Sequence, residues 1–288
     1  MLLSKTFENQ ELHYFFIGII IQFTILAIIF YFVEKIKPVE PKTPYFKKDF
    51  SLEALYMNLN DAFFAPFITL LITFLFTHSL YLFLPHQLFA AEIAMLPFAL
   101  QIFLASVYND FFIYWRHRFT HHYWWPYHAM HHSAEQLSWL TKGRLHPLDL
   151  TMAIAFSTFG LYIAGFSDEV IYYAMIVNTC VDYFSHANLD VNLKKPWCYL
   201  INNPRFHRWH HANMKEAYNK NFCSTYPFID LLFGTYHFPE DRMPDKYGIL
   251  PKEQAQIPAT YLGHLIHPLR VHGRKIAKFF SNSPNQKS

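Results

Sequence analysis

Histidine recurs at spacings of three and four residues in three short stretches of the chain, which we call the histidine boxes. The boxes are His117-Arg118-Phe119-Thr120-His121, His128-Ala129-Met130-His131-His132 and His207-Arg208-Trp209-His210-His211. Residues three or four apart share one face of an α-helix, so each box would present its imidazoles together. Imidazole is the commonest nitrogen ligand for iron, zinc, copper and nickel in proteins. Two identical H-x-x-H-H triplets and an H-x-x-x-H pair therefore predict metal binding.

The number of candidate ligands favours two metal ions close together. The boxes supply eight histidines, more than one tetrahedral or octahedral ion can use, and His186 at the end of an apolar run is the natural ninth. Asp182, four residues before His186, and Asp110, two helical turns before His117, are candidates to orient an imidazole through its second nitrogen. Either carboxylate could instead cap a helix or pair with lysine or arginine. His146 is expected to act indirectly on the metal or to begin a helix.

The other histidines lack this spacing, and we do not expect them to bind metal. They are His13, His78, His86, His122, His237, His264, His267 and His272.

Long apolar runs must position the boxes. Five runs with few charges occupy residues 12–33, 62–84, 88–112, 150–166 and 170–184. About 20 apolar helical residues cross the hydrocarbon core of a bilayer, where only helices or closed barrels satisfy the backbone. The runs are continuous rather than alternating, which favours helices. We therefore predict an all-α integral membrane bundle with four or five transmembrane helices, of which the first is a retained anchor.

The charges of the chain orient this bundle and exclude other classes of protein. With 52% hydrophobic residues, 16% charged residues and a net charge of +3, the chain is neither a disordered protein nor a nucleic-acid binder led by basic patches. Three cysteines without C-x-x-C spacing exclude a disulfide framework and a thiolate zinc module. Lysine and arginine concentrate in 35–48, 113–147 and 188–250. The positive-inside rule places these segments in the cytosol, where 113–147 and 188–250 would form a helical cap that carries the histidines.

Three regions follow from these patterns. Residues 1–60 are expected to form a membrane anchor and a cytosolic linker, and residues 61–250 a membrane domain that contains the three boxes. Residues 251–288 form a tail in which a semi-apolar stretch, 261–269, precedes a basic patch. Such a tail could lie on the membrane surface or form a solvated helix. All six tryptophans lie in or beside the histidine segments, which favours an aromatic belt at the membrane interface.

From about residue 109 to 248 the chain resembles the fatty acid hydroxylase superfamily, which includes sterol desaturases, sterol methyl oxidases and alkylglycerol monooxygenases. The resemblance rests on the three boxes in order and on the residues that flank them. These are Asp110, Tyr114 and Trp115 before the first box; Ser133, Ala134 and Glu135 after the second; Arg144-x-His146-Pro147; Ser185-His186-Ala187-Asn188; Asn203-Pro204 before the third box; Asn221-Phe222; and Asp230-Leu231-Leu232-Phe233-Gly234-Thr235. One residue departs from the pattern, because several sterol-type members have a further histidine where this chain has Phe206.

The resemblance implies a non-haem di-iron membrane enzyme that uses O₂ and two electrons to hydroxylate or desaturate a lipid. Its nine metal ligands would be His117, His121, His128, His131, His132, His186, His207, His210 and His211, with zinc as a substitute for iron. The substrate could be a sterol, a fatty acyl chain or an ether lipid. Electrons are expected from a separate cytochrome b5-like protein, or from a ferredoxin with its reductase. The membrane would be a bacterial inner membrane or the endoplasmic reticulum.

Two other classes of protein remain open from the residues alone. A histidine-rich metal transporter would carry its ligands inside the spans, whereas the boxes lie at or beyond the ends of the predicted spans. A two-zinc membrane hydrolase is the second, because nitrogen ligands do not by themselves separate zinc from iron. Such hydrolases usually add a carboxylate base near the ions, and none is built into the boxes.

Overall fold

The computed structural model describes residues 9–75 and 88–281, whose regular secondary structure is helical apart from one isolated antiparallel bridge between Ala212 and Tyr247. The all-α prediction is confirmed for these residues. The main helices are α1 (Asn9–Ile36), α2 (Phe50–Leu59), α3 (Ala65–Leu75), α5 (Phe98–Tyr123), α6 (Trp125–His132), α7 (Pro147–Ala164), α8 (Asp168–His186), α10 (Pro204–His210) and α13 (Tyr261–Ser281). Shorter helices are α4 (Ala90–Ala94), α9 (Trp197–Leu200), α11 (Phe228–Leu232) and α12 (Pro251–Gln254).

Local sequence fixes where the helices that carry histidines begin and end. Pro126 and Pro204 occupy the first turns of α6 and α10, where a missing N–H costs nothing. The side chain of Asn203 accepts a hydrogen bond from the N–H of Phe206 and caps α10. Gly165 ends α7 with a φ of +91°, a left-handed conformation that glycine adopts without strain.

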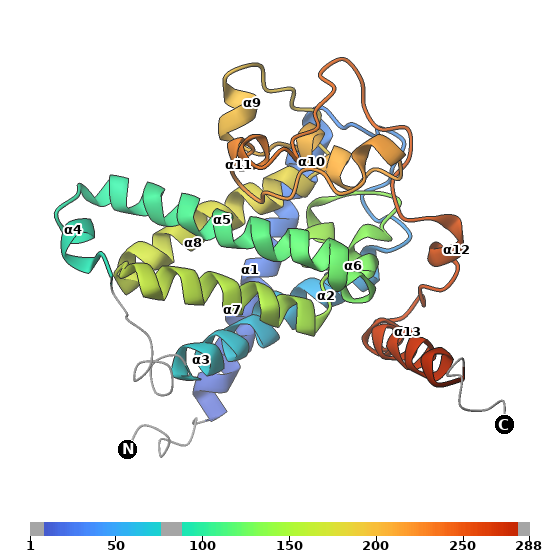
Figure 1. Cartoon of the computed structure of the whole chain (residues 1–288), viewed down its shortest axis with the longest axis horizontal. Helices are drawn as coiled ribbons and strands as arrows, with labels where there is room; N and C mark the ends of the chain where they lie inside the picture. Colours follow the sequence, from blue (N-terminus) through green and yellow to red (C-terminus); the bar gives the residue numbers. More distant parts are fainter. Residues whose placement is uncertain (1–8, 76–87, 282–288) are drawn as a thin grey trace.

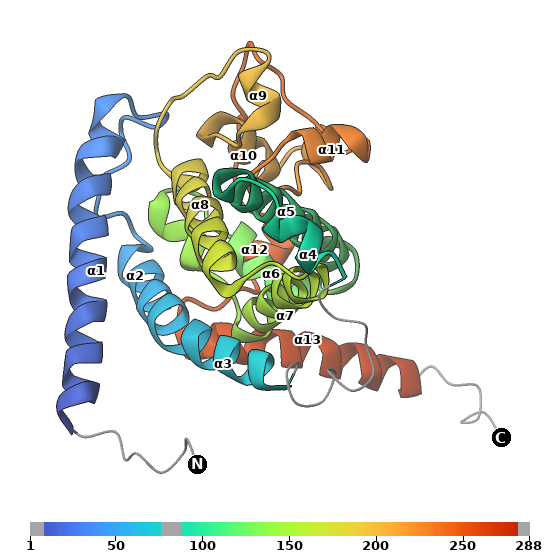
Figure 2. The same cartoon turned by 90° about the vertical axis from the view of Figure 1, so that its left-hand side faces the viewer.

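Helices α5, α7 and α8 lie side by side and form the centre of the molecule (Figure 1). A buried cluster of Ala105, Leu161, Val170 and Ala174 joins the three helices. Figure 2 shows α9, α10 and α11 on one side of them and α3 on the opposite side, while α1 stands along one edge. The two short segments that carry the second and third boxes therefore pack against the ends of long, rigid helices.

A buried carboxylate attaches α1 to the histidine-bearing region. Glu34 accepts hydrogen bonds from the N–H groups of Trp139 and Asn188, at 3.0 and 2.9 Å. The ring of Trp139 stacks on Phe30 of α1 with a centroid separation of 5.1 Å. Trp139 is fully buried, as is Trp209 of α10, so the predicted tryptophan belt is wrong for these two residues. Their burial follows from helix packing that composition cannot reveal.

Among the described residues, one helix is long and apolar enough to cross a membrane, namely α7 (Pro147–Ala164), and α3 (Ala65–Leu75) is a shorter apolar helix. The prediction of four or five membrane spans thus stays a prediction. The last part of the second predicted span, 76–84, lies outside the described residues, as do His78 and His86.

The C-terminal helix α13 docks through histidines that are not in the boxes. Nε2 of His264 donates to the carbonyl of Pro258 at 2.6 Å, which leaves Nδ1 to accept from the Tyr56 hydroxyl of α2 at 3.0 Å. Nε2 of His146 donates to the carbonyl of Leu265. These buried contacts fix one end of α13 against α2 and the start of α7.

Acid should loosen this docked end of α13. Burial, with a further contribution from the nearby Arg144 and His267 charges, lowers the pKa of His264 from 6.5 to about 4. A released His264 would bind a proton below its usual pKa of about 6.5, whereas the docked one resists protonation down to about pH 4. The docked state is therefore fully stable above pH 6.5 and loses stability as pH falls from 6.5 towards 4.

Proteolytic cleavage within 261–281 should accelerate over this range, and His264→Gln should flatten the pH dependence. An unchanged cleavage rate between pH 7.5 and 5 would contradict this account.

The contact between α5 and α7 depends on the absence of a side chain at Gly160. A Cβ atom at this position would lie 2.4 Å from the ring of Phe112 on α5. We expect Gly160→Ala to lower the free energy of unfolding by about 1–3 kcal/mol, because the ring or the helix must move. Thermal unfolding in detergent measures the effect. Gly18→Ala is the matched control, since nothing lies within 4 Å of its Cβ position, and equal midpoints for the two variants would refute the tight contact.

Candidate metal centre

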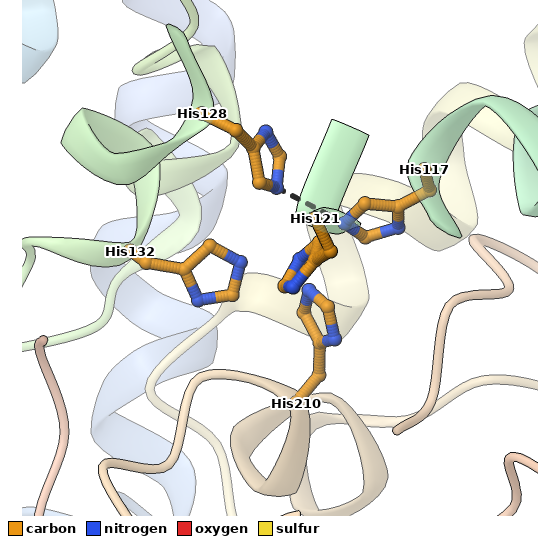
Figure 3. A group of neighbouring side chains, drawn as sticks. All are labelled: His117, His121, His128, His132 and His210. Atoms are coloured by element: carbon orange, nitrogen blue, oxygen red, sulfur yellow. Dashed lines mark hydrogen bonds between the residues drawn. The ribbon is translucent and has the colours of Figure 1, made fainter. Parts of the chain in front are cut away.

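Four separate elements bring nine histidines together. Helix α5 supplies His117 and His121, α6 supplies the second box, α8 ends at His186, and α10 with its C-cap supplies the third box. The histidines form two groups, in each of which one nitrogen of every imidazole lies within 4.8 Å of all the others. Group A is His117, His121, His128, His132 and His210, and group B is His131, His186, His207 and His211. Figure 3 shows the five rings of group A pointing towards a common centre.

The two groups adjoin, so two ions bound there would be neighbours. The rings of His132 in group A and His211 in group B stack with centroids 4.5 Å apart. His128 of group A and His131 of group B lie 5.1 Å apart by the same measure. The structure thus places all nine histidines as the sequence predicts and divides them into five and four. Their role as ligands stays a prediction.

Hydrogen bonds in group A determine which nitrogen of each ring faces the centre. Nδ1 of His117 donates to the carbonyl of Phe222 at 2.8 Å, and Nδ1 of His128 donates to the carboxylate of Asp149 at 2.7 Å. A neutral imidazole has one N–H, so both Nε2 atoms carry only a lone pair. These two Nε2 atoms are 3.1 Å apart. Neither can donate a proton to the other, and the arrangement is repulsive unless a cation lies between them.

The remaining imidazoles of group A add Nε2 atoms without a hydrogen-bond partner. Nδ1 of His210 donates to the carbonyl of Lys220 at 2.8 Å. The Nε2 atoms of His121, His132 and His210 are all buried without a hydrogen-bond partner among the described residues. Buried polar atoms are almost always satisfied, so three orphaned nitrogens in one place indicate a missing ligand.

Group B also contains closely spaced Nε2 atoms. Nε2 of His207 lies 2.9 Å from Nε2 of His186 and 3.1 Å from Nε2 of His211, and Nε2 of His186 lies 3.4 Å from that of His131. Metal–nitrogen bonds of about 2.1 Å separate neighbouring ligand atoms by roughly 3.0 Å in octahedral and 3.4 Å in tetrahedral geometry. Both groups therefore fit a transition-metal ion by spacing and by donor chemistry.

Burial keeps these imidazoles in the neutral form that binds metal. Desolvation, followed by the charges of neighbouring imidazoles, holds the pKa values of His117, His131 and His211 well below the usual 6.5. Desolvation also lowers the pKa of His210 to about 3. The site therefore presents lone pairs at neutral pH without first having to lose protons.

The family described as fatty acid hydroxylase matches residues 102–235, the part of the chain that contains all nine histidines. The match covers just under half of the chain. The family resemblance drawn from the three boxes is confirmed.

Several curated proteins are similar to this chain. An ornithine lipid hydroxylase from Rhizobium tropici is 31% identical over 62% of this chain and 53% of its own length. A putative methylsterol monooxygenase from Dictyostelium discoideum is 26% identical over 50% of this chain and 54% of its own. An alkylglycerol monooxygenase from Xenopus tropicalis is 28% identical over 49% of this chain and 30% of its own. The matches span about half the length of these relatives, or less, and no solved structure matches the chain.

Family residues outside the boxes support the site through a loop, 220–226. Asp230 accepts hydrogen bonds from the N–H groups of Phe222 and Cys223, at 2.8 and 2.9 Å, and from the hydroxyl of Thr235 at 2.6 Å. Asn221 is buried with a left-handed φ of +58°, which asparagine tolerates, and its side chain accepts from the N–H of His237. These contacts aim the carbonyls of Lys220 and Phe222 at His210 and His117.

The prediction that Asp110 orients His117 directly is wrong. The fully buried carboxylate of Asp110 accepts hydrogen bonds from the backbone N–H groups of Ser224, Thr225 and Tyr226, at 2.8, 3.0 and 2.6 Å. Its carboxylate therefore faces the loop 220–226 and not an imidazole. Asp110 therefore acts one step away from the imidazoles, by holding the loop whose carbonyls orient them.

The other two candidates for an indirect role differ from one another. Nδ1 of His186 donates to the backbone carbonyl of Asp182 at 2.8 Å, and the carboxylate of Asp182 lies 3.4 Å from the same nitrogen. Asp182 thus contacts its predicted partner, mainly through the backbone. Within the described residues, His146 contacts no imidazole of either group. Its Nδ1 instead caps α7 by accepting a hydrogen bond from the N–H of Leu148 at 3.0 Å. The alternative prediction, a helix start, is correct for this residue.

Sequence reasoning missed Asp149, the one carboxylate that binds a box histidine strongly. Asp149 is fully buried in the first turn of α7 and accepts from both His128 Nδ1 and Arg116 Nη1, at 2.7 and 2.9 Å. Acidic residues are common in the first turn of a helix, so the position of Asp149, two residues after Pro147, did not by itself indicate contact with a histidine. Only the packing of α7 beside α5 and α6 reveals its role.

Replacing Asp149 with asparagine should weaken the metal site while the fold persists. The carboxylate fixes the His128 tautomer that leaves Nε2 free, and such partners typically contribute roughly 10- to 100-fold in metal affinity. We expect the affinity of the ion in group A to fall by about this amount in Asp149→Asn, measured by competition with a chromophoric chelator.

Asp190→Asn provides the matched control. Asp190 also pairs with an arginine, Arg205, and with Lys37, but within the described residues it forms no hydrogen bond or ion pair with a histidine of group A or B. Equal metal affinity in the two variants, with both proteins folded by circular dichroism, would contradict the role of Asp149.

Proposed function

We propose that the chain is a membrane-bound non-haem di-iron oxygenase that uses O₂ and two electrons to hydroxylate or desaturate a lipid. The observation that carries the proposal is the pair of adjoining imidazole groups, in each of which one nitrogen of every ring lies within 4.8 Å of the others, with the Nε2 lone pairs of His117 and His128 facing one another at 3.1 Å. The names of the related proteins, which include lipid hydroxylases and monooxygenases, support the same class of reaction. Two iron ions, when bound, would supply the O₂ and electron chemistry that side chains cannot provide.

The residues of the chain hold and orient the ions. Group A would hold one ion through five Nε2 atoms and group B the other through four. The backbone carbonyls of Phe222, Lys220 and Asp182 and the carboxylate of Asp149 keep the second ring nitrogens protonated, so that the lone pairs stay directed inwards.

A cavity of about 370 Å³ is suited to the lipid. It reaches His117 and His128 of group A and His131, His186 and His207 of group B. We call it the lipid cavity; α1, α3, α5, α7 and α8 contribute to its walls. Its apolar lining includes Leu150, Ala153, Ile154 and Met175, while Asn109, Ser157, Asn178 and Thr179 add hydrogen-bonding groups. This mixed lining favours a lipid that carries polar atoms near the reacting carbon, such as an aminoacyl lipid, a sterol or an ether lipid, over an unbroken alkyl chain.

The membrane would surround the helices that wall the lipid cavity. Large apolar side chains are exposed along α1, α3 and α8, a pattern that marks contact with lipid rather than water. They include Ile20, Ile21, Ile25, Ile28, Phe32, Phe67, Leu70, Phe74, Tyr172 and Ile176. Together with α5 and α7 these helices would form the spans, and the histidine-bearing segments would face the cytosol. A separate electron donor, cytochrome b5-like or a ferredoxin with its reductase, would meet the protein on that side.

Metal analysis and isotope labelling test this proposal. Protein purified without a histidine tag should contain two irons per chain, and membranes supplied with ¹⁸O₂ and a lipid extract should yield an ¹⁸O-labelled lipid if the product is hydroxylated. Tightly held zinc combined with hydrolytic turnover would instead support a membrane hydrolase and overturn the oxygenase.

Alanine variants of the two groups should separate the ions. His210→Ala and His121→Ala remove ligands of group A, and His131→Ala removes one of group B. Each should reduce iron content and lower activity at least about 100-fold, while membrane insertion persists, because the ligands act as a unit. His122→Ala is the control: His122 is exposed and its Nδ1 bonds the carbonyl of Arg118. Full iron content in the three ligand variants would refute the assignment.

A further inference from the structure

A second cavity, of about 300 Å³, reaches the metal centre from another direction. His121, His132 and His210 line it, and all three belong to group A. The other walls come from Trp125, the loop after α10, and the segment 248–253, which includes Leu250 and Glu253. None of the lining residues belongs to group B, nor to α1, α3, α7 or α8. We call it the group A cavity.

The two cavities divide access to the two groups unequally. The lipid cavity touches members of both groups, through His117 and His128 on one side and His131, His186 and His207 on the other. The group A cavity touches the three remaining imidazoles of group A, whose Nε2 atoms are the buried ones without partners. An ion in group A could therefore be approached from two sides, and an ion in group B, within the described residues, from the lipid cavity.

The group A cavity differs from the lipid cavity in which elements wall it. Helices α1, α3 and α8, whose exposed apolar side chains would face lipid, do not contribute to it. Its walls combine apolar side chains such as Trp125 and Leu250 with the polar groups of Asn213 and Glu253. Its volume of about 300 Å³ is close to that of the lipid cavity, so its position rather than its size separates the two.

Helix α12 covers this cavity and is held by two side-chain hydrogen bonds. Trp125 Nε1 donates to Glu253 Oε2 at 3.4 Å, and Gln254 Nε2 donates to the carbonyl of Ser133 at 3.0 Å. Leu250, at the N-cap of α12, lines the cavity and is 49% exposed, so its side chain lies where the cavity meets the surface.

We propose that the group A cavity is a separate entrance through which small ligands, dioxygen or small anions, reach the ion of group A without passing through the lipid cavity. This inference rests on the proposed function only in requiring an ion at group A. It assigns the large ligand and the small one to different faces of the centre. A lipid that fills the lipid cavity would then leave one face of group A open.

The binding rate of azide to the oxidised, iron-loaded protein tests this entrance. Azide is a small anion that binds ferric ions, and stopped-flow absorption follows its association. We expect Leu250→Trp, which narrows the cavity mouth, to slow azide association about tenfold, and Leu250→Ala to accelerate it. Because Leu250 is half exposed and makes no polar side-chain contact, both variants should fold, as far-UV circular dichroism and iron content will verify.

Two matched tryptophan variants locate the effect. Leu232→Trp, on α11, changes a side chain that is 72% exposed and lines neither cavity, so azide should bind at the wild-type rate. Met175→Trp narrows the lipid cavity and should also leave the azide rate unchanged.

The outcomes distinguish the entrance from the proposed function. The entrance is refuted if Leu250→Trp leaves the azide association rate unchanged, or if Met175→Trp lowers that rate instead. Small ligands would then arrive through the lipid cavity, and the proposed di-iron centre would be unaffected. If the purified protein binds no iron, both the proposed function and the entrance fail.

Discussion

The structure depends on one electrostatic constraint: imidazole lone pairs packed within about 3 Å of one another are stable only around a cation. In group A, His117 and His128 each give their single proton to an oxygen acceptor outside the group, so their facing nitrogens have nothing to share. Burial of His117 and of the adjacent His121 lowers the pKa of each ring, which prevents their protonation from relieving the repulsion. The chain thus brings together groups that repel one another, and a bound metal ion would offset this repulsion.

The fold maintains this arrangement through oxygen acceptors that lie one layer behind the imidazoles. Two buried carboxylates, Asp110 and Asp230, hold the loop 220–226, and that loop directs the carbonyls of Lys220 and Phe222 at two rings. Asp149 directs a third ring from the start of α7. Because the supports come from α5, α7, α11 and a loop, the geometry of the centre is sensitive to packing far from the ions.

The same packing shapes access to the centre. Residues of helices α5, α7 and α8 line the lipid cavity, and this cavity reaches histidines of both groups. The segment after α10 and the short helix α12 approach group A from elsewhere and enclose the group A cavity. A centre with one cavity walled by α1, α3, α7 and α8 and another walled by other segments can keep a lipid and a small ligand apart.

The sequence by itself determined the histidine set, the helical class and the family. Box spacings of three and four residues follow from the local geometry of a helix, and proline and asparagine signals mark where α6 and α10 begin, so these features are readable without tertiary contacts. Only the tertiary structure decided three other features. The histidines divide into groups of five and four, Asp149 rather than Asp110 lies beside an imidazole, and Trp139 is buried. Each depends on which residues from distant parts of the chain become neighbours, and neither periodicity nor composition encodes the direction in which one helix packs on another.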